Sequence, residues 1–121
     1  MSKSILVIED DEQVRILLKK MLENAGYSVA EAPNGEIGIT MYRENPQDLV
    51  ITDLIMPEKE GIETIRELLS DNPGAKIIAI SGGGSVDPEQ YLHMAERLGV
   101  LKTFAKPFRR EEILQAVQEL I

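Results

Sequence analysis

Short apolar runs alternate with amphipathic segments along the whole of this chain. The apolar runs have the length of strands and lie at residues 4–9, 27–32, 48–52, 76–80 and 101–105. Each is followed by a segment whose apolar residues recur at helical spacing, namely 11–25, 35–44, the stretch from Ile62 to Leu69, 87–98 and 109–120. Strict alternation of strands and helices predicts one parallel sheet with right-handed crossovers and helices on both faces.

The predicted sheet belongs to a doubly wound α/β fold. For five parallel strands of this kind the common order is 2-1-3-4-5, so we expect a flavodoxin-like (βα)5 fold. A chain of 121 residues fits one domain of ordinary size, and we expect residues 1–121 to form a single domain without an output domain. The absence of cysteine excludes disulfides and thiolate metal sites.

Charge and hydropathy exclude several classes of partner. The net charge of −8 argues against direct binding of nucleic acid, which requires clustered lysine and arginine. Only four apolar residues precede Glu9, too few for a signal peptide, and no apolar run approaches the length of a membrane span. We therefore expect a cytoplasmic protein without membrane insertion.

Polar side chains gather where the predicted strands end. Glu9-Asp10-Asp11 follow the first strand and Asp53 the third, while Ser81 and Lys106 follow the fourth and fifth. Ligands of open α/β sheets bind beyond the carboxyl ends of the strands, at the reversal of strand order between strands one and three. Two carboxylates about 4 Å apart repel by about 4 kcal/mol at an effective dielectric constant of about 20, so either one acid holds a proton or a cation sits between them. Oxygen ligands favour Mg²⁺, and zinc is disfavoured because there is no cysteine and the only histidine, His93, lies in a helical segment. We interpret His93 as a surface or groove histidine.

Each of these residues also has a purely structural interpretation. Asp10 or Asp11 can cap the first helix, Asp53 can cap a loop, and the stem of Lys106 can pack on apolar surface. An unpaired aspartate at the end of a buried strand is expensive, which favours a cation near Asp53. Gly82-Gly83-Gly84 lacks the Lys-Ser/Thr ending of a nucleotide-binding loop, so we interpret it as a loop of small residues beside the site.

Taken together, these residues resemble the receiver domain of two-component response regulators. The matching motifs are, in chain order, Glu9-Asp10 after the first strand, Asp53 followed by Met56-Pro57 and Gly61, Ser81 after the fourth strand, and Lys106-Pro107-Phe108 after the fifth. The resemblance covers essentially the whole chain, at the expected spacing. Each motif is weak alone, but the ordered set is highly specific.

The resemblance implies a metal site and a phosphoryl acceptor. Asp53 is expected to accept the phosphoryl group and to contribute to the metal site. Asp10 is expected to bind Mg²⁺ directly, and Glu9 to act through a water molecule. The main-chain carbonyl of Ile55, two residues after the acceptor, is expected to complete the protein ligands.

The resemblance also implies the reaction and its partners. The Asp53 carboxylate is expected to take the phosphoryl group from a phosphohistidine of a sensor histidine kinase or histidine phosphotransfer protein, or from a small acyl phosphate. Ser81 is expected to hydrogen-bond a phosphoryl oxygen, and Lys106, in a cis peptide with Pro107, to pair with the phosphoryl group. The phosphorylated chain is expected to bind a downstream target protein in a bacterial phosphorelay. It is not expected to be an enzyme beyond its own phosphorylation and dephosphorylation.

The chain departs from the family pattern three residues before the lysine. Receivers usually carry Tyr or Phe there as a rotamer switch, whereas this chain has Thr103, followed by Phe104. Thr103 as a smaller switch is one alternative, but we favour movement of the glycine-rich loop and of the helix at 87–98. Ile55 and Gly83 stand where many receivers place polar side chains that guide the attacking water. We therefore expect slow self-dephosphorylation.

Two other functions stay open, a Mg²⁺-dependent phosphatase or phosphotransferase and a phosphorylation-independent scaffold. Aspartate-nucleophile phosphatases typically place a second Asp where this chain has Ile55, which counts against the phosphatase. A flavodoxin-like cofactor carrier is also disfavoured, because acids 9–11 would repel the phosphate of a flavin cofactor. By analogy with the family, the partner surface is expected on the fourth helix, fifth strand and fifth helix, which also offer a face for a homodimer. Its candidate residues are Tyr91, Met94, Lys102, Arg109 and Arg110.

Overall fold

The computed structural model describes residues 3–54, 61–82 and 88–121, with no side-chain description for 88–92. Within these ranges the strands are β1 Ser4–Ile8, β2 Ser28–Ala32, β3 Leu49–Asp53, β4 Ile77–Ser81 and β5 Lys102–Ala105. The helices are α1 Glu12–Asn24, α2 Gly35–Glu44, α3 Gly61–Asp71, α4 Pro88–Leu98 and α5 Arg110–Leu120. All strand pairs are parallel, and their order is β2-β1-β3-β4-β5, which confirms the predicted doubly wound α/β fold.

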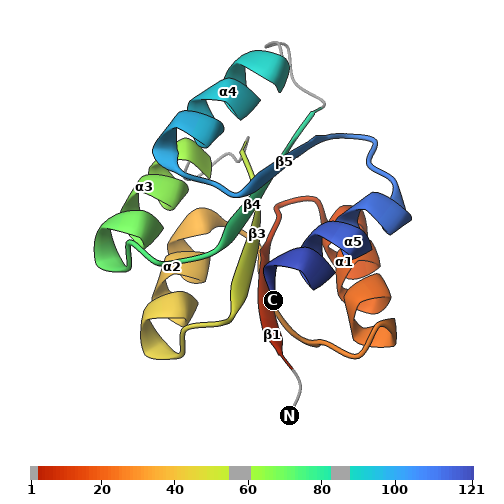
Figure 1. Cartoon of the computed structure of the whole chain (residues 1–121). Helices are drawn as coiled ribbons and strands as arrows, with labels where there is room; N and C mark the ends of the chain where they lie inside the picture. Colours follow the sequence, from red (N-terminus) through yellow and green to blue (C-terminus); the bar gives the residue numbers. More distant parts are fainter. Residues whose placement is uncertain (1–2, 55–60, 83–87) are drawn as a thin grey trace.

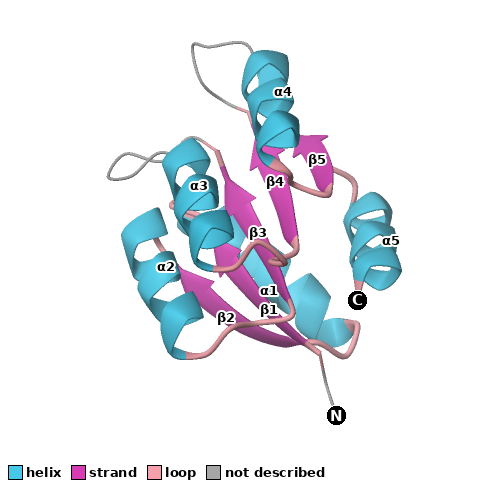
Figure 2. Cartoon of the chain, turned by 60° about the vertical axis from the view of Figure 1, so that its left-hand side comes forward, coloured by secondary structure: helices cyan, strands magenta, loops and turns pink. Residues whose placement is uncertain are grey.

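Helices cover both faces of the sheet. In Figure 1, α1 and α5 lie on one side, and α2, α3 and α4 lie on the other. Figure 2 is turned toward the second side and places α1 behind the sheet. Alternate side chains of β1 therefore enter different cores: Ile5 and Val7 pack with α1 and α5, while Leu6 and Ile8 pack with α2 and α3. Burial on both faces explains why the central strands are almost wholly apolar.

Two strands extend one residue farther than the sequence predicts. Asp53 is the last residue of β3 and is paired with Ile80, and Ser81 is the last residue of β4 and is paired with Ala105. Both polar residues therefore belong to the ladder itself. Glu9 was expected within the first strand but lies just beyond it, although its N–H still donates to the Ala32 carbonyl at 3.1 Å.

Helix α1 begins with a side-chain cap. Asp11 is its N-cap, and its Oδ1 accepts hydrogen bonds from the N–H groups of Gln13 and Val14 at 2.9 and 3.3 Å. Of the two capping residues considered from the sequence, the structure therefore selects Asp11, which leaves Asp10 available for another role. No helix in the described ranges is long and apolar enough to cross a membrane.

Candidate functional site

Three carboxylates meet at the carboxyl edge of the sheet. One oxygen from each of Glu9, Asp10 and Asp53 lies within 4.8 Å of the others. The register of β1 on β3, with Ile8 opposite Thr52, brings the residues that follow them together although they are far apart in the sequence. Glu9 and Asp53 are 1% and 4% exposed, whereas Asp10 is exposed. The expected acidic cluster is therefore present, with two members buried and one facing solvent.

Lys106 reaches this cluster from the end of β5. Its Nζ lies 2.8 Å from Oε1 of Glu9 and 3.5 Å from Oδ2 of Asp53. Its main-chain N–H donates to the Ser81 carbonyl at 2.7 Å, and the Lys106–Pro107 peptide bond is cis, as expected. A Cβ on Gly82 would lie 2.7 Å from Cβ of Lys106, so a glycine at 82 allows this segment to approach β4.

Burial dominates the electrostatics of Glu9. It raises the pKa of the Glu9 carboxyl to about 8; the hydrogen bond from Lys106 opposes this rise, and the charge of Asp53 adds to it. Burial lowers the pKa of the Lys106 ammonium, but the hydrogen bond to Glu9 and the charges of Asp53 and Glu9 outweigh it, so the pKa is raised overall. Both pKa values therefore rise: burial disfavours the charged form of Glu9, and the neighbouring acids favour the charged form of Lys106.

The donor set fits a hard divalent cation. Glu9, Asp10 and Asp53 offer only oxygen atoms, which Mg²⁺ prefers, and the exposure of Asp10 leaves room for the waters that Mg²⁺ usually keeps. Ile55, whose carbonyl was expected to be a further ligand, lies outside the described residues, as do Met56, Pro57 and Gly83.

Ser81 carries a buried hydroxyl at the same edge. The residue is fully buried, and its Oγ has no hydrogen-bond partner in the described part of the chain. An unsatisfied buried hydroxyl costs about 1–3 kcal/mol, so such groups are rare unless a ligand satisfies them. Ser81 directly follows Ile80, which is paired with Asp53, so its position is consistent with the expected contact to a group on Asp53.

The other residues considered from the sequence lie away from the acids. Thr103 is paired with Ala79, and its Oγ1 donates to Oε1 of Glu96 on α4 at 3.2 Å. Phe104 packs partly buried against the core on the side of α1 and α5. The His93 side chain is 74% exposed, in agreement with its interpretation as a surface histidine.

Sequence reasoning missed two features that shape the site. A Cβ on Gly61 would collide with the Asp53 carbonyl oxygen and with Cα of Leu54, so this glycine lets α3 begin directly against the end of β3. Arg15 donates from Nη1 to the Glu9 carbonyl at 3.0 Å and so holds the acidic loop. The resemblance included Gly61 without a physical reason, and no periodic pattern marks Arg15.

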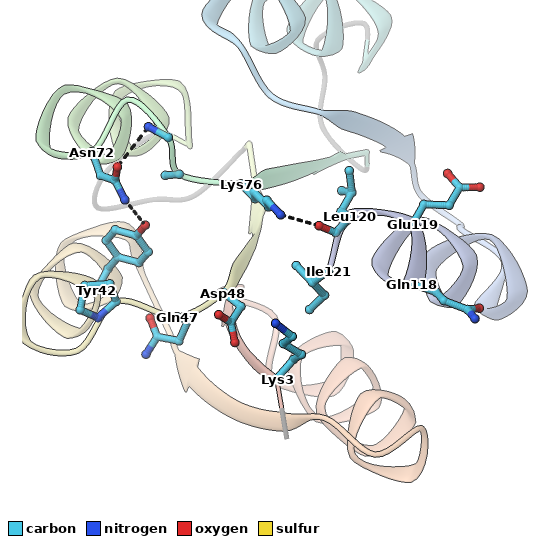
Figure 3. Close-up of a pocket in the computed structure, with 13 residues that line it drawn as sticks. Lys3, Tyr42, Gln47, Asp48, Asn72, Lys76, Gln118, Glu119, Leu120 and Ile121 are labelled. Atoms are coloured by element: carbon cyan, nitrogen blue, oxygen red, sulfur yellow. Dashed lines mark hydrogen bonds between the residues drawn. The ribbon is translucent and has the colours of Figure 1, made fainter. Parts of the chain in front are cut away.

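Two hollows have similar volumes but different surroundings. A polar pocket of about 440 Å³ lies at the opposite, amino-terminal edge of the sheet (Figure 3). There Lys76 Nζ donates to the Leu120 carbonyl at 2.7 Å and Asn72 Nδ2 to the Tyr42 hydroxyl at 3.0 Å, so these polar groups join neighbouring elements of the chain. The second, an apolar hollow of about 420 Å³, adjoins the acidic site and is lined by Val14, Leu17, Lys106, Pro107 and Phe108.

Comparisons with known proteins agree with this arrangement. The family model for the response regulator receiver domain matches residues 5–118. The chain is 34% identical to the chemotaxis protein CheY of Thermotoga maritima, covering 99% of this chain and 98% of that protein. It is 30% identical to sporulation initiation phosphotransferase F of Bacillus subtilis, covering 100% of this chain and 95% of that protein. A receiver domain structure from Clostridium thermocellum superposes with a TM-score of 0.90 at 28% identity over 98% and 94% of the two chains. This chain belongs to the family of response regulator receiver domains.

Proposed function

We propose that this chain is a phosphorylation-dependent switch in which Asp53 accepts a phosphoryl group. The observation that carries the proposal is the position of Asp53, which is 4% exposed at the end of β3, near two other acids and 3.5 Å from the ammonium of Lys106. A carboxylate in these surroundings is oriented for attack, and a cation beside it can stabilise charge on an incoming phosphoryl group.

The proposed reaction transfers a phosphoryl group to the Asp53 carboxylate. An Asp53 oxygen attacks phosphorus in line, forming an O–P bond while the N–P bond of a donor phosphohistidine breaks and its electron pair returns to the imidazole. With an acyl phosphate, the O–P bond to the acyl group breaks instead. Lys106 pairs with the phosphoryl oxygens, and the Ser81 hydroxyl donates a hydrogen bond to one of them. Attack of water on the aspartyl phosphate later releases phosphate and restores the carboxylate.

Asp10 and Asp53 would bind Mg²⁺ directly, with Glu9 acting through water and the Ile55 carbonyl as a further ligand by family resemblance. When bound, Mg²⁺ neutralises negative charge on the phosphoryl oxygens. This assignment is supported by the cluster of three carboxylates, whose oxygens lie within 4.8 Å of one another.

Phosphorylation would switch partner binding through charge. By analogy with phosphoserine, it adds about −1.5 to −2 charges at Asp53. The side chains of Lys106 and Ser81 can move toward this new charge. We propose that the output passes through the loop after β4 and through α4, to a target protein or a second copy on the face of α4, β5 and α5. On that face Met94 is 41% exposed, and Lys102 forms an exposed ion pair with Glu119 at 3.4 Å.

The donor must reach Asp53 from the same edge of the sheet. The apolar hollow beside Lys106 is supported as its docking surface by its position and by Leu17, which is 55% exposed. We therefore propose that the kinase or phosphotransfer protein contacts α1 and the segment after β5.

The phosphoryl group on Asp53 should persist, because Ile55 and Gly83 offer no polar side chain to guide the attacking water. Ile55→Asn should speed hydrolysis, and an unchanged or slower rate would contradict this explanation.

Phosphorylation by acetyl phosphate tests the proposal directly. Intact mass should increase by one phosphoryl group in Mg²⁺ but not in EDTA, and not in Asp53→Ala. Asp48→Ala, which removes an exposed acid at the opposite edge, should be phosphorylated like the wild type. Absence of an adduct, together with no response to beryllofluoride, would favour the scaffold. Repeated turnover of a phosphate monoester would instead favour a phosphatase.

A further inference from the structure

Arg15 of α1 joins the acidic loop to the edge strand β2. Its Nη1 donates to the main-chain carbonyl of Glu9, and its Nε donates to Oε1 of Glu31, each at 3.0 Å. The Arg15 side chain is only 16% exposed, and Lys19 Nζ holds the other oxygen of Glu31 at 3.1 Å. One planar guanidinium therefore connects a strand to the main chain of a residue in the acidic cluster.

The bonds around Asp10 leave its main chain little freedom. On one side, the Glu9 N–H donates to the Ala32 carbonyl and the Glu9 carbonyl accepts from Arg15. On the other side, the Asp11 N–H donates to Oε2 of Glu9 at 3.1 Å, and the Asp11 carbonyl accepts from the Arg15 N–H at 2.9 Å. Asp10 itself is exposed, so its orientation depends on these neighbours. Arg15 takes part on both sides, once through its side chain and once through its main chain.

The positive charge of Arg15 by itself acts against cation binding at the acidic cluster. A guanidinium near a cation site repels the cation, and by Coulomb's law alone its removal should strengthen cation binding. Glu31 moderates that repulsion, and the hydrogen bonds from Lys19 and Arg15 lower the pKa of its carboxyl, so it is ionised at neutral pH. A positioning effect and an electrostatic effect of Arg15 therefore differ in sign.

We infer that Arg15, held by Glu31, is a positioning residue that fixes Glu9 and Asp10 for binding a divalent cation. The inference deepens the proposed function, on which it rests for the identity of the cation as Mg²⁺. It does not require that Asp53 be phosphorylated. Residues that orient metal ligands through hydrogen bonds commonly contribute about 10–100-fold to metal affinity.

Mg²⁺ titration of the metal-free protein by calorimetry tests this inference. Arg15→Gln, which removes the charge and the two-armed contact, should weaken Mg²⁺ binding by about tenfold. Arg15→Lys keeps the charge but cannot reproduce the planar fork, so it should also bind Mg²⁺ more weakly than the wild type. Equal or tighter binding by Arg15→Gln would overturn the inference, because repulsion would then be the main effect of Arg15.

Two further variants separate positioning from general damage. Arg43→Gln removes a different arginine, whose Nε lies 2.6 Å from Oδ2 of Asp71, and should leave Mg²⁺ affinity unchanged. Glu31→Gln should weaken binding, and the effect of Arg15→Gln should shrink in its presence if the pair acts as a unit. Full additivity would overturn that coupling. Should Arg15→Gln fail to fold by circular dichroism, Glu31→Gln carries the test, since its side chain is 32% exposed.

The titration also keeps this inference distinct from the proposed function. A wild type that binds Mg²⁺ but accepts no phosphoryl group would refute phosphorylation of Asp53, while the effect of Arg15→Gln on affinity would still be measurable. A wild type without detectable Mg²⁺ binding would overturn the inference. Loss of Mg²⁺ binding in Asp10→Asn would confirm that the titration reports this site.

Discussion

Replacing Gly61 with alanine should destabilise the protein and displace Asp53, the proposed phosphoryl acceptor. A Cβ at this position would collide with the carbonyl oxygen of Asp53 and Cα of Leu54, and would lie 2.9 Å from the Leu54 carbonyl carbon. All three are main-chain atoms at the end of a buried strand, so no side-chain rotation relieves the collision. The Gly61 N–H also donates to the Leu54 carbonyl at 2.9 Å, which keeps α3 close to the strand.

The magnitude follows from two opposing effects. Overpacking of a well-packed interior typically costs about 1–3 kcal/mol, and a collision with main chain belongs toward the upper end. Alanine recovers about 0.4–1 kcal/mol by restricting the unfolded chain. We therefore expect a net loss of about 1–2.5 kcal/mol in the free energy of unfolding. Gly74→Ala is the matched control, because its Cβ would meet only Oδ1 of Asn72 at 3.5 Å, an ordinary contact.

Urea unfolding followed by far-ultraviolet circular dichroism measures both variants. Gly74→Ala should be as stable as the wild type or slightly more stable, and Gly61→Ala clearly less stable. Because a shift of about 1 Å in a reacting group can reduce a rate by about 100-fold, phosphorylation of Gly61→Ala by acetyl phosphate should also slow markedly. Equal stability of the two variants, to within about 0.5 kcal/mol, would refute the steric reasoning.

Three further changes probe other contacts. Lys106→Gln removes the ammonium that lies 2.8 Å from Oε1 of Glu9 and 3.5 Å from Oδ2 of Asp53. In EDTA at pH 7, urea titration should therefore show a loss of about 1–2 kcal/mol that Mg²⁺ partly restores, and a more stable variant would contradict this. The pKa of Asp48 is lowered, chiefly by the hydrogen bond from the Ser4 N–H. The ionised carboxylate therefore stabilises the folded protein fully above the usual pKa of aspartate, and this contribution is lost as pH falls through the lower pKa of the folded state. Asp48→Asn should therefore cost less than about 1 kcal/mol at pH 7, and urea titrations should show that difference closing in acid. Thr103→Val removes one exposed hydrogen bond to Glu96 and should leave the beryllofluoride-induced changes in α4 amide resonances intact; their loss would make Thr103 the switch.

The fold and the acidic cluster could be predicted because they depend on periodicity. Apolar runs of strand length alternate with helical segments, and that pattern admits few topologies. Once β1 and β3 are neighbours, Glu9 and Asp53 must meet at one edge, whatever the details of packing. The prediction placed Asp53 just after its strand, but hydrogen bonding across the sheet extends β3 by that residue. Such end positions depend on the neighbouring strand, which a local pattern does not include.

Contacts between main chain and side chain could not be predicted in the same way. Arg15 was one of several charged residues on an amphipathic helix, and its partners are a main-chain carbonyl and a glutamate on another strand. The need for glycine at 82 depends on the path of the Lys106 segment, which the sequence of the loop does not reveal. These features arise from how elements pack together, and they determine where the predicted site residues lie.

The resting contacts of Lys106 and Ser81 suggest how the proposed switch would obtain its driving force. Lys106 Nζ lies nearer to Glu9, at 2.8 Å, than to Asp53, at 3.5 Å, and Ser81 Oγ has no partner in the described part of the chain. A phosphoryl group on Asp53 would attract the ammonium by its added charge and offer the hydroxyl an acceptor. Switching would then weaken the contact between Lys106 and Glu9, but it would break no hydrogen bond of the Ser81 hydroxyl in the described part of the chain, and the lysine is already beside Asp53. In the proposed switch the energy would therefore come mainly from new contacts of the phosphoryl group with Lys106 and with the Ser81 hydroxyl, which has no partner among the described residues.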